Sequence, residues 1–275
     1  MSISDTSARE LPPIQPEGFW DGVTRGYIPG ETLSIDTSLT LHAGVARDID
    51  PVPLEVVRYS LMNINLEHSD LLQRLCVSPV TMLTRDYQVS LLTELGDLVF
   101  LGPNLQYFSN SHALSIKYML EHRAAAPGIH PGDMFLSNDP YVGAPHQPDT
   151  CLAAPVFVGD ELFCWVANTM HHSDVGGSMP GSFCIDAMDT FQEPLSWPPV
   201  KLIEGGKLRS EIEELFIRQS RQRGAVQMDM RAAIGANEAT RAKILTLVER
   251  YGADVVKGVM QTTMDAGERL MAERL

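Results

Sequence analysis

The chain is organised around residues 131–182, which read PGDMFLSNDPYVGAPHQPDTCLAAPVFVGDELFCWVANTMHHSDVGGSMPGS. Two apolar segments, 151–158 and 161–169, flank Gly159-Asp160 and predict a β-hairpin. Loops rich in Asp and His lie on either side of this hairpin. Because a sheet can hold polar loops rigidly at one of its ends, the stretch predicts a sheet that carries a functional site.

The polar loops contain a possible set of metal ligands. His146 and Asp149 lie three positions apart around Pro148, so both side chains can reach one ion. A third ligand would come from His171 or His172 at the end of the second strand, where only one of two adjacent side chains can face a given site. Imidazole and carboxylate ligands without thiolate suit Zn²⁺, Mn²⁺ or Fe²⁺, and three protein ligands leave room for water or substrate. Asp174, just beyond, can orient a ligand or bind directly.

Each polar feature also has a purely structural interpretation. His and Asp residues gather in loops by chance and face water, and Asn138-Asp139-Pro140 is also typical of an Asx-turn before proline. His68 lies on the apolar face of a helical pattern and is expected to be a hydrogen-bonded core histidine. The four scattered Cys residues are expected to be buried reduced thiols.

Composition excludes some classes of function. The chain has 275 residues, 44% of them hydrophobic, and a formal net charge of −14. Nucleic acids and anionic membranes need a positive surface, so neither is an expected partner. The N-terminus shows no secretion signal, and no apolar run approaches the length of a membrane span, so the expected location is the cytoplasm.

The pattern of elements predicts an α+β fold. In it, β-hairpins and a mixed sheet bear the metal-site loops and are packed by long helices, with an extended N-terminal arm. Helices are expected over 51–79, 110–122, 210–221, 228–250 and 253–275, and strands over 86–92, 97–101, 132–137, 151–158 and 161–169. Ser210 and Glu213 have the spacing of a capping box that opens a helix.

Three regions are expected along the chain: an arm over 1–50, an α/β metal-binding core over 51–207 and a helical segment over 208–275. The arm is rich in Pro, Gly, Ser and Thr, with a possible short hairpin near Leu33–His42. Its aromatic residues Phe19, Trp20 and Tyr27 favour an arm laid over a neighbouring subunit, because disordered tails contain few aromatics.

Several of these motifs resemble the hydantoinase B family. They are residues 50–58 (DPVPLEVVR), 132–141 (GDMFLSNDPY), 146–149 (HQPD), 171–177 (HHSDVGG) and 199–202 (PVKL). The family includes subunits of ATP-dependent hydantoinases, 5-oxoprolinases, lactamases, and acetone and acetophenone carboxylases. The Pro- and aromatic-rich arm favours the acetophenone type. Family members usually continue well past residue 275, which implies that this chain is an N-terminal part, and they usually have Gly-Gly where this chain has Gly143-Ala144.

The resemblance implies roles for individual residues and partners. A divalent metal, Zn²⁺ or Mn²⁺, would be held by His146, Asp149 and His171, with His172 and Asp174 orienting the ligands or transferring protons. A hydantoinase A-type partner with a kinase fold would use ATP to phosphorylate the substrate, and no ATP-binding motif is visible in this chain.

Three functions follow as hypotheses. The first is a metal-bearing subunit of an ATP-dependent carboxylase, a C–C bond-forming ligase that adds bicarbonate or CO₂ to a ketone. The second is a subunit of an ATP-dependent hydrolase that opens a cyclic amide such as a hydantoin, 5-oxoproline or a lactam. The third is a non-catalytic assembly subunit whose His and Asp residues are structural.

Overall fold

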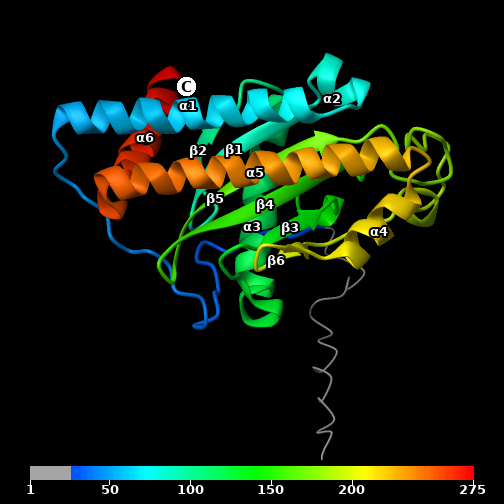
Figure 1. Cartoon of the computed structure of the whole chain (residues 1–275), viewed down its shortest axis with the longest axis horizontal. Helices are drawn as coiled ribbons and strands as arrows, with labels where there is room; N and C mark the ends of the chain where they lie inside the picture. The colour runs from blue at the N-terminus through cyan, green and yellow to red at the C-terminus, as the bar shows by residue number, and fades with distance from the viewer. Residues whose placement is uncertain (1–25) are drawn as a thin grey trace, which may run out of the picture.

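The computed structural model describes residues 26–275. The predictions made for the first 25 residues of the arm, including Phe19 and Trp20, lie outside the described residues. The remainder folds as helices packed on both faces of one antiparallel sheet (Figure 1).

The sheet has seven strands in the order β2-β1-β5-β4-β3-β6-β7. Their bounds are β1 Tyr87–Thr93, β2 Leu98–Leu101, β3 Met134–Ser137, β4 Asp149–Val158, β5 Glu161–His171, β6 Val200–Glu204 and β7 Lys207–Leu208. Both predicted hairpins form, as β1–β2 and β4–β5, and they join through β1 and β5. The α+β class is confirmed.

The sheet differs from the mixed sheet expected from the sequence. Every pair of named strands is antiparallel, because tight turns reverse the chain between the paired neighbours β1–β2, β4–β5 and β6–β7. Within residues 26–275, a parallel pairing occurs only at the isolated bridge between Leu41 and Leu162.

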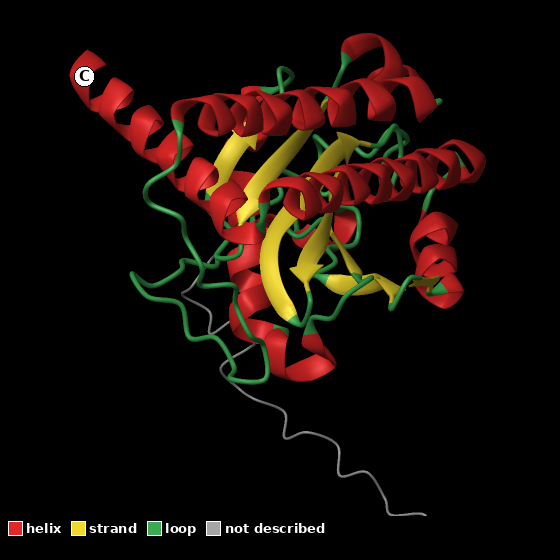
Figure 2. Ribbon diagram, turned by 60° about the vertical axis from the view of Figure 1, so that its left-hand side comes forward, coloured by secondary structure: helices red, strands yellow, loops and turns green. Residues whose placement is uncertain are grey.

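Helices cover the two faces unequally (Figure 2). Helices α1 (Pro51–Leu75), α5 (Arg223–Tyr251) and α6 (Ala253–Arg274) pack one face with a large apolar core, and α3 (Ser111–His122) packs the other. Two shorter helices, α2 (Pro79–Thr84) and α4 (Ser210–Gln219), lie at the ends of these layers. The predicted break between α5 and α6 is confirmed at Gly252, whose φ of 86° ends the first helix.

The described part of the arm packs on its own chain. Tyr27 meets Tyr118 of α3 edge to face with ring centroids 5.4 Å apart. Farther along, His42 places Nδ1 2.7 Å from Glu161 and Nε2 3.1 Å from Asp254. The expected hairpin near Leu33–His42 is wrong, because Leu41 pairs with Leu162 of β5 and no strand pairing forms within residues 26–50 of the arm. Tyr27 and His42 find partners on α3, β5 and α6, and contact of the arm with a neighbouring subunit stays a prediction.

The predicted capping box at Ser210 is also wrong. Ser210 is the first helical residue of α4, Arg209 is the cap, and no side chain caps this helix end. Glu213 instead binds Arg231 of α5 through two hydrogen bonds of 2.8 and 3.1 Å. A charged partner eighteen residues away in sequence therefore outcompetes the local motif.

Buried histidines and cysteines behave as the structural interpretations predicted. His68 is 1% exposed and lies 3.4 Å from the amide nitrogen of Asn168, so the prediction of a core histidine is confirmed. His112, on α3, is fully buried between Ser90 at 2.6 Å and Thr169 at 2.7 Å. All four cysteines are free and buried.

These buried rings make stability depend on pH. Burial lowers the pKa of His112 to about 3, and burial, with His112 nearby, lowers that of His68 to about 3. Between that value and an unfolded pKa of about 6.5 the unfolded state binds more protons, so stability falls as pH falls through this window. We expect His112→Asn to reduce the mean slope between pH 7 and pH 5 by about 1 kcal/mol per pH unit. Urea unfolding at pH 7 and pH 5 measures the slope.

The control for this prediction is His130→Asn, because His130 is exposed. That variant should keep the wild-type dependence on pH. An unchanged slope in His112→Asn would contradict the prediction, whatever its stability at neutral pH.

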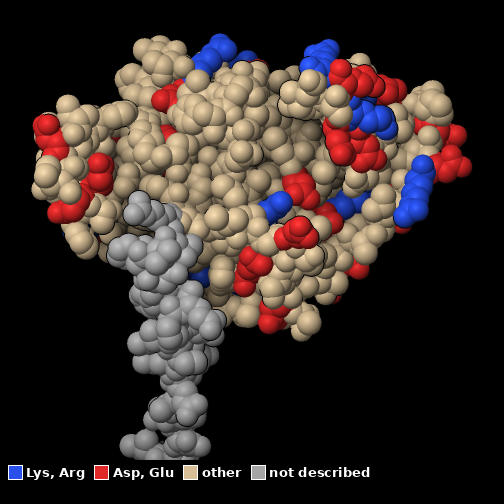
Figure 3. All heavy atoms as spheres, turned by 180° about the vertical axis from the view of Figure 1, so that it is seen from behind, with Lys and Arg blue, Asp and Glu red and all other residues tan. Residues whose placement is uncertain are grey.

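Charged side chains are scattered over the face of the described residues that Figure 3 shows. On the face in Figure 3, described Lys and Arg side chains form no continuous patch, in keeping with the net charge of −14. No helix within residues 26–275 is both long and apolar enough to cross a bilayer.

Candidate metal centre

The β4–β5 hairpin brings two of the predicted ligands together. Asp149 is the first residue of β4 and His171 the last of β5, and the two are paired directly across the strands. Side chains of such a pair project to the same face with Cβ atoms about 4.5–5.5 Å apart. The hairpin register therefore places a carboxylate and an imidazole side by side.

His146 reaches the same place from the loop before β4. This loop turns at Gly143, which has a φ of 116°, and a Cβ there would lie 2.9 Å from the Ser111 carbonyl oxygen and 3.0 Å from Leu114. A side chain at position 143 would push the loop away from α3. Asn138 holds the next turn by donating to the carbonyl of Gln147 at 2.8 Å.

The three side chains converge on one point. One ligand atom from each of His146, Asp149 and His171 lies within 4.8 Å of the others. Nδ1 of His171 is 3.0 Å from Asp149 Oδ1, Nε2 of His146 is 3.0 Å from Asp149 Oδ2, and the two nitrogens are 3.2 Å apart. Asp149 is fully buried, His171 is 4% exposed, and the His146 side chain is 34% exposed, so the site opens on the His146 side.

Charge within this triad favours an ionised carboxylate. Burial would raise the pKa of Asp149, but the imidazoles of His146 and His171 lower it below its ordinary value. Burial likewise opposes a charge on His146, and Asp149 outweighs this effect and raises the His146 pKa. The carboxylate is therefore in the anionic form that binds cations.

The residues fit a divalent metal ion. Oδ2 of Asp149 is buried and makes no hydrogen bond of acceptable geometry, although His146 is close. The two imidazole nitrogens lie 3.2 Å apart, and each lies 3.0 Å from one oxygen of the Asp149 carboxylate, an arrangement that leaves lone pairs unmatched unless a proton or a cation lies between them. Two nitrogens and one oxygen form a ligand set suited to Zn²⁺ or Mn²⁺.

Two further polar residues, Asp86 and Tyr107, reach the site, and sequence reasoning missed both. Asp86 precedes β1, and its Oδ2 lies 4.0 Å from Nδ1 of His171. Tyr107 donates its hydroxyl to Asp86 Oδ1 at 3.1 Å. Burial, then the charges of Asp149 and Asp86, raise the pKa of Tyr107 above its ordinary value. Asp86 arrives through the pairing of β1 with β5, which no local motif encodes.

His172 lies away from the triad, on the other face of the strand end. Its ring packs 5.9 Å from that of Phe216, and burial, with His171 beside it, lowers its pKa to about 3. Its backbone N–H donates to the carbonyl of Pro148 at 2.9 Å. The residue thus ties the end of β5 to the loop that carries His146 and Asp149.

Asp174 is also buried, but its carboxylate is fully engaged in structure. Oδ1 accepts the backbone N–H groups of Gly176 and Arg221, and Oδ2 accepts the N–H of Gly181 and the Arg221 guanidinium at 3.0 Å. Four donors fill the acceptor sites of one carboxylate. This arrangement favours a positioning role in the loop that follows the triad.

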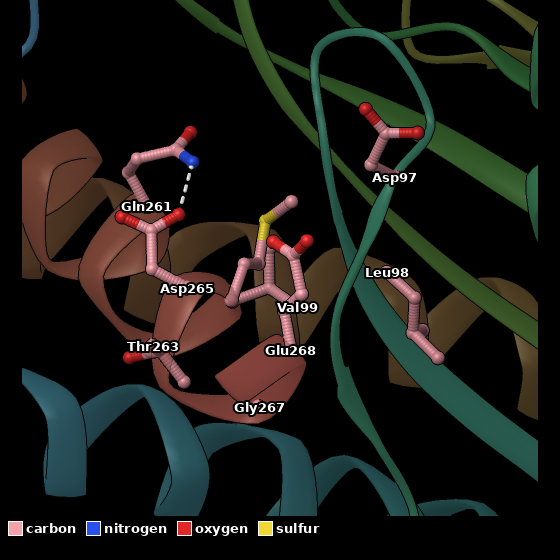
Figure 4. A pocket seen from close by; sticks show the side chains of 9 residues that line it. Asp97, Leu98, Val99, Gln261, Thr263, Asp265, Gly267 and Glu268 are labelled. Atoms are coloured by element: carbon pink, nitrogen blue, oxygen red, sulfur yellow. Dashed lines mark hydrogen bonds between the residues drawn. The ribbon is translucent and has the colours of Figure 1, made fainter. Parts of the chain in front are cut away.

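Asp139 and Asp133, also in the central stretch, make structural contacts. Asp139 accepts the backbone N–H of Tyr141 at 2.9 Å, which is the Asx-turn considered from the sequence. Asp133 pairs with Lys201 at 2.9 Å. A hollow of about 490 Å³ between β2 and α6 is a separate feature, and none of the triad lines it (Figure 4).

The sequence of this chain is similar to those of known proteins. A family model described as hydantoinase B/oxoprolinase matches residues 50–275. The chain is 30% identical to caprolactamase subunit beta of Pseudomonas jessenii, over 81% of this chain and 38% of that protein. It is 29% identical to acetophenone carboxylase delta subunit of Aromatoleum aromaticum, over 84% of this chain and 34% of that protein.

A solved structure matches the fold as well. The crystal structure of the ATP-dependent caprolactamase from Pseudomonas jessenii superposes with a TM-score of 0.73 at 30% identity, covering 81% of this chain and 38% of that one. The chain therefore spans well under half the length of the relatives that it matches.

Proposed function

The chain belongs to the hydantoinase B/oxoprolinase family, and on that premise we propose that it is the metal-bearing part of a subunit in an ATP-dependent carboxylase complex. The proposed reaction adds bicarbonate or CO₂ to a ketone of the acetone or acetophenone kind. The observation that carries this proposal is the convergence of His146, Asp149 and His171 within 4.8 Å. The likeness to acetophenone carboxylase delta subunit supports the choice of a ketone.

The residues of the site have distinct tasks in this proposal. His146, Asp149 and His171 would hold Zn²⁺ or Mn²⁺, and the bound ion would supply Lewis-acid chemistry to the reaction. Asp86 holds the hydroxyl of Tyr107 toward the site. His172 and Asp174 are the proposed supporting residues. The contact of His172 with Pro148 favours a role in holding the ligand loop, and the contact of Asp174 with Gly181 favours a role in holding the loop after β5. These contacts favour positioning over direct proton transfer.

The ATP-dependent step is proposed for a partner. The chain contains no Gly-rich phosphate loop of the P-loop type. The two relatives are named as a beta and a delta subunit, in keeping with complexes of several subunits. We propose a hydantoinase A-type subunit with a kinase fold, together with other subunits of the complex, as the partners of this chain.

The second candidate function is hydrolysis of a cyclic amide. It is supported by the 30% identity to caprolactamase subunit beta, which is as high as the 29% identity to acetophenone carboxylase delta subunit. The same three ligands would then serve a hydrolytic step on a phosphorylated lactam, hydantoin or 5-oxoproline.

The assembled complex distinguishes the two candidates. We expect ADP release to require both acetophenone and bicarbonate, because carboxylation consumes both substrates, and to stay at background with 5-oxoproline or hydantoin. Coupled measurement of ADP and of incorporated labelled bicarbonate checks this expectation. ADP release only with the cyclic amides would contradict the proposed carboxylase function and support the hydrolase function.

A further inference from the structure

A large apolar side chain, Phe183, lies directly against the triad. Its ring centroid is 5.5 Å from that of His171, with the planes 26° apart, and 5.6 Å from that of His146. Phe183 is nevertheless 58% exposed. One part of the ring therefore covers the imidazoles, and the rest is available to a molecule that enters the site.

The loop that carries Phe183 is held by buried hydrogen bonds. Ser182, just before it, has a φ of 62°, which few residues other than glycine adopt. Its hydroxyl accepts from the backbone N–H of Val175 at 2.8 Å and donates to the carbonyl of Gly176 at 2.9 Å. Since Ser182 is 3% exposed, the fold over-determines this uncommon conformation.

Asp174 and Arg221 close the same loop. Asp174 accepts from Gly181 at 3.0 Å, and the guanidinium of Arg221 donates to Asp174 at 3.0 Å and to the carbonyl of Gly177 at 2.6 Å. The position of Phe183 is thus set by a network that reaches from the end of β5 to the end of α4. Such support is typical of side chains whose placement serves a site.

A second aromatic side chain borders the site. Tyr107 is 51% exposed and bonds to Asp86, the carboxylate next to His171. The polar triad is therefore bordered by two partly exposed rings. The ring of Phe183 can bind the flat face of another ring, and it offers no hydrogen-bonding partner to the N–H and C=O groups of a cyclic amide.

We infer that Phe183 determines substrate specificity, by stacking with the flat apolar part of an aryl ketone beside the triad. The inference rests on the proposed function, because it assumes that the substrate binds at the triad. It makes aryl ketones the expected substrates. Asp174, Ser182 and Arg221 then act as positioning residues, because they hold the loop that carries Phe183.

The chain supplies a matched control for the test. Phe191 belongs to the same loop region but is 94% exposed, so its ring is almost entirely in solvent. Phe183→Ala removes the stacking surface, Phe183→Leu keeps apolar volume without a flat ring, and Phe191→Ala removes an equal ring elsewhere. Because Phe183 is largely exposed, its truncation is expected to leave the fold intact, which circular dichroism verifies.

The measurement is binding of acetophenone to the full chain, by ligand-observed NMR titration, with 5-oxoproline as the polar comparison. We expect wild type to bind acetophenone more tightly than 5-oxoproline. Phe183→Ala should weaken acetophenone binding by about 10-fold, since both ring stacking and apolar burial are lost. Phe183→Leu should fall between the two, and Phe191→Ala should match wild type.

Two results would overturn the inference: acetophenone bound no better than 5-oxoproline by wild type, or equal weakening in Phe183→Ala and Phe191→Ala. Elemental analysis of the same samples separates this inference from the proposed function. Acetophenone binding that depends on Phe183 in a chain unable to hold metal would refute the metal centre alone. Metal held without such dependence would refute the role of Phe183 alone.

Discussion

Replacing Asp149 with Asn is expected to abolish stoichiometric binding of Zn²⁺ or Mn²⁺ to the chain. The carboxylate is fully buried, contacts both imidazoles at 3.0 Å, and carries the one negative charge inside the triad. Changing groups that only orient metal ligands costs about 10–100-fold in affinity, so loss of a charged ligand is expected to reach about 100-fold or more. Metal titration followed by elemental analysis measures the affinity.

The control is Asp139→Asn, nearby in the chain. Asp139 caps a short turn through Tyr141 and lies outside the triad, so its metal content should equal that of wild type. Undiminished metal binding and undiminished turnover of the complex in Asp149→Asn would favour the non-catalytic assembly subunit.

The second large effect is expected at Lys201. Its ammonium lies 2.9 Å from Asp133, and the two side chains are 3% and 0% exposed. Lys201→Met removes the positive charge and leaves a buried carboxylate that keeps only its bonds from the backbone of His130 and Gly205. Breaking a buried pair in this way destabilises by about 3–5 kcal/mol. Guanidinium unfolding gives the free energy of unfolding.

Two comparisons make this prediction specific. Lys207→Met, on the exposed strand β7, should change stability by no more than about 0.5 kcal/mol. The double variant Asp133→Asn with Lys201→Met should recover part of the loss, because it no longer buries an unpaired charge. A single variant Lys201→Met as stable as Lys207→Met would show that the pair contributes nothing.

Local properties, the hairpin and the strand period, are enough to predict His146, Asp149 and one of the pair His171 and His172 as ligands, and the family resemblance favours His171 within that pair. Alternation along β5 separates His171 from His172 before any coordinates are known. The direct pairing of Asp149 with His171 depends on the hairpin register, and the tight turn at Gly159-Asp160 constrains that register. This part of the site is encoded within 26 consecutive residues, 146–171.

Other parts of the site are not local, and sequence reasoning missed them for that reason. Asp86 reaches His171 through the pairing of two hairpins, and Phe183 reaches it through a loop closed by Arg221, which follows α4. The failed capping box at Ser210 has the same cause, since Glu213 binds Arg231 on another helix. In each case the decisive contact joins residues that are distant in sequence, so the pattern of adjacent residues does not predict it.

The contacts of His42 have a consequence for how the chain is made. Its partner Asp254 is 212 positions later, so the arm cannot complete this contact until the start of α6 has left the ribosome. At about 5–20 residues per second, this delay is roughly 10–40 s. During that time residues 40–42 can already pair with Leu162 of β5, so the arm is held at one of its two attachments while the other waits for α6.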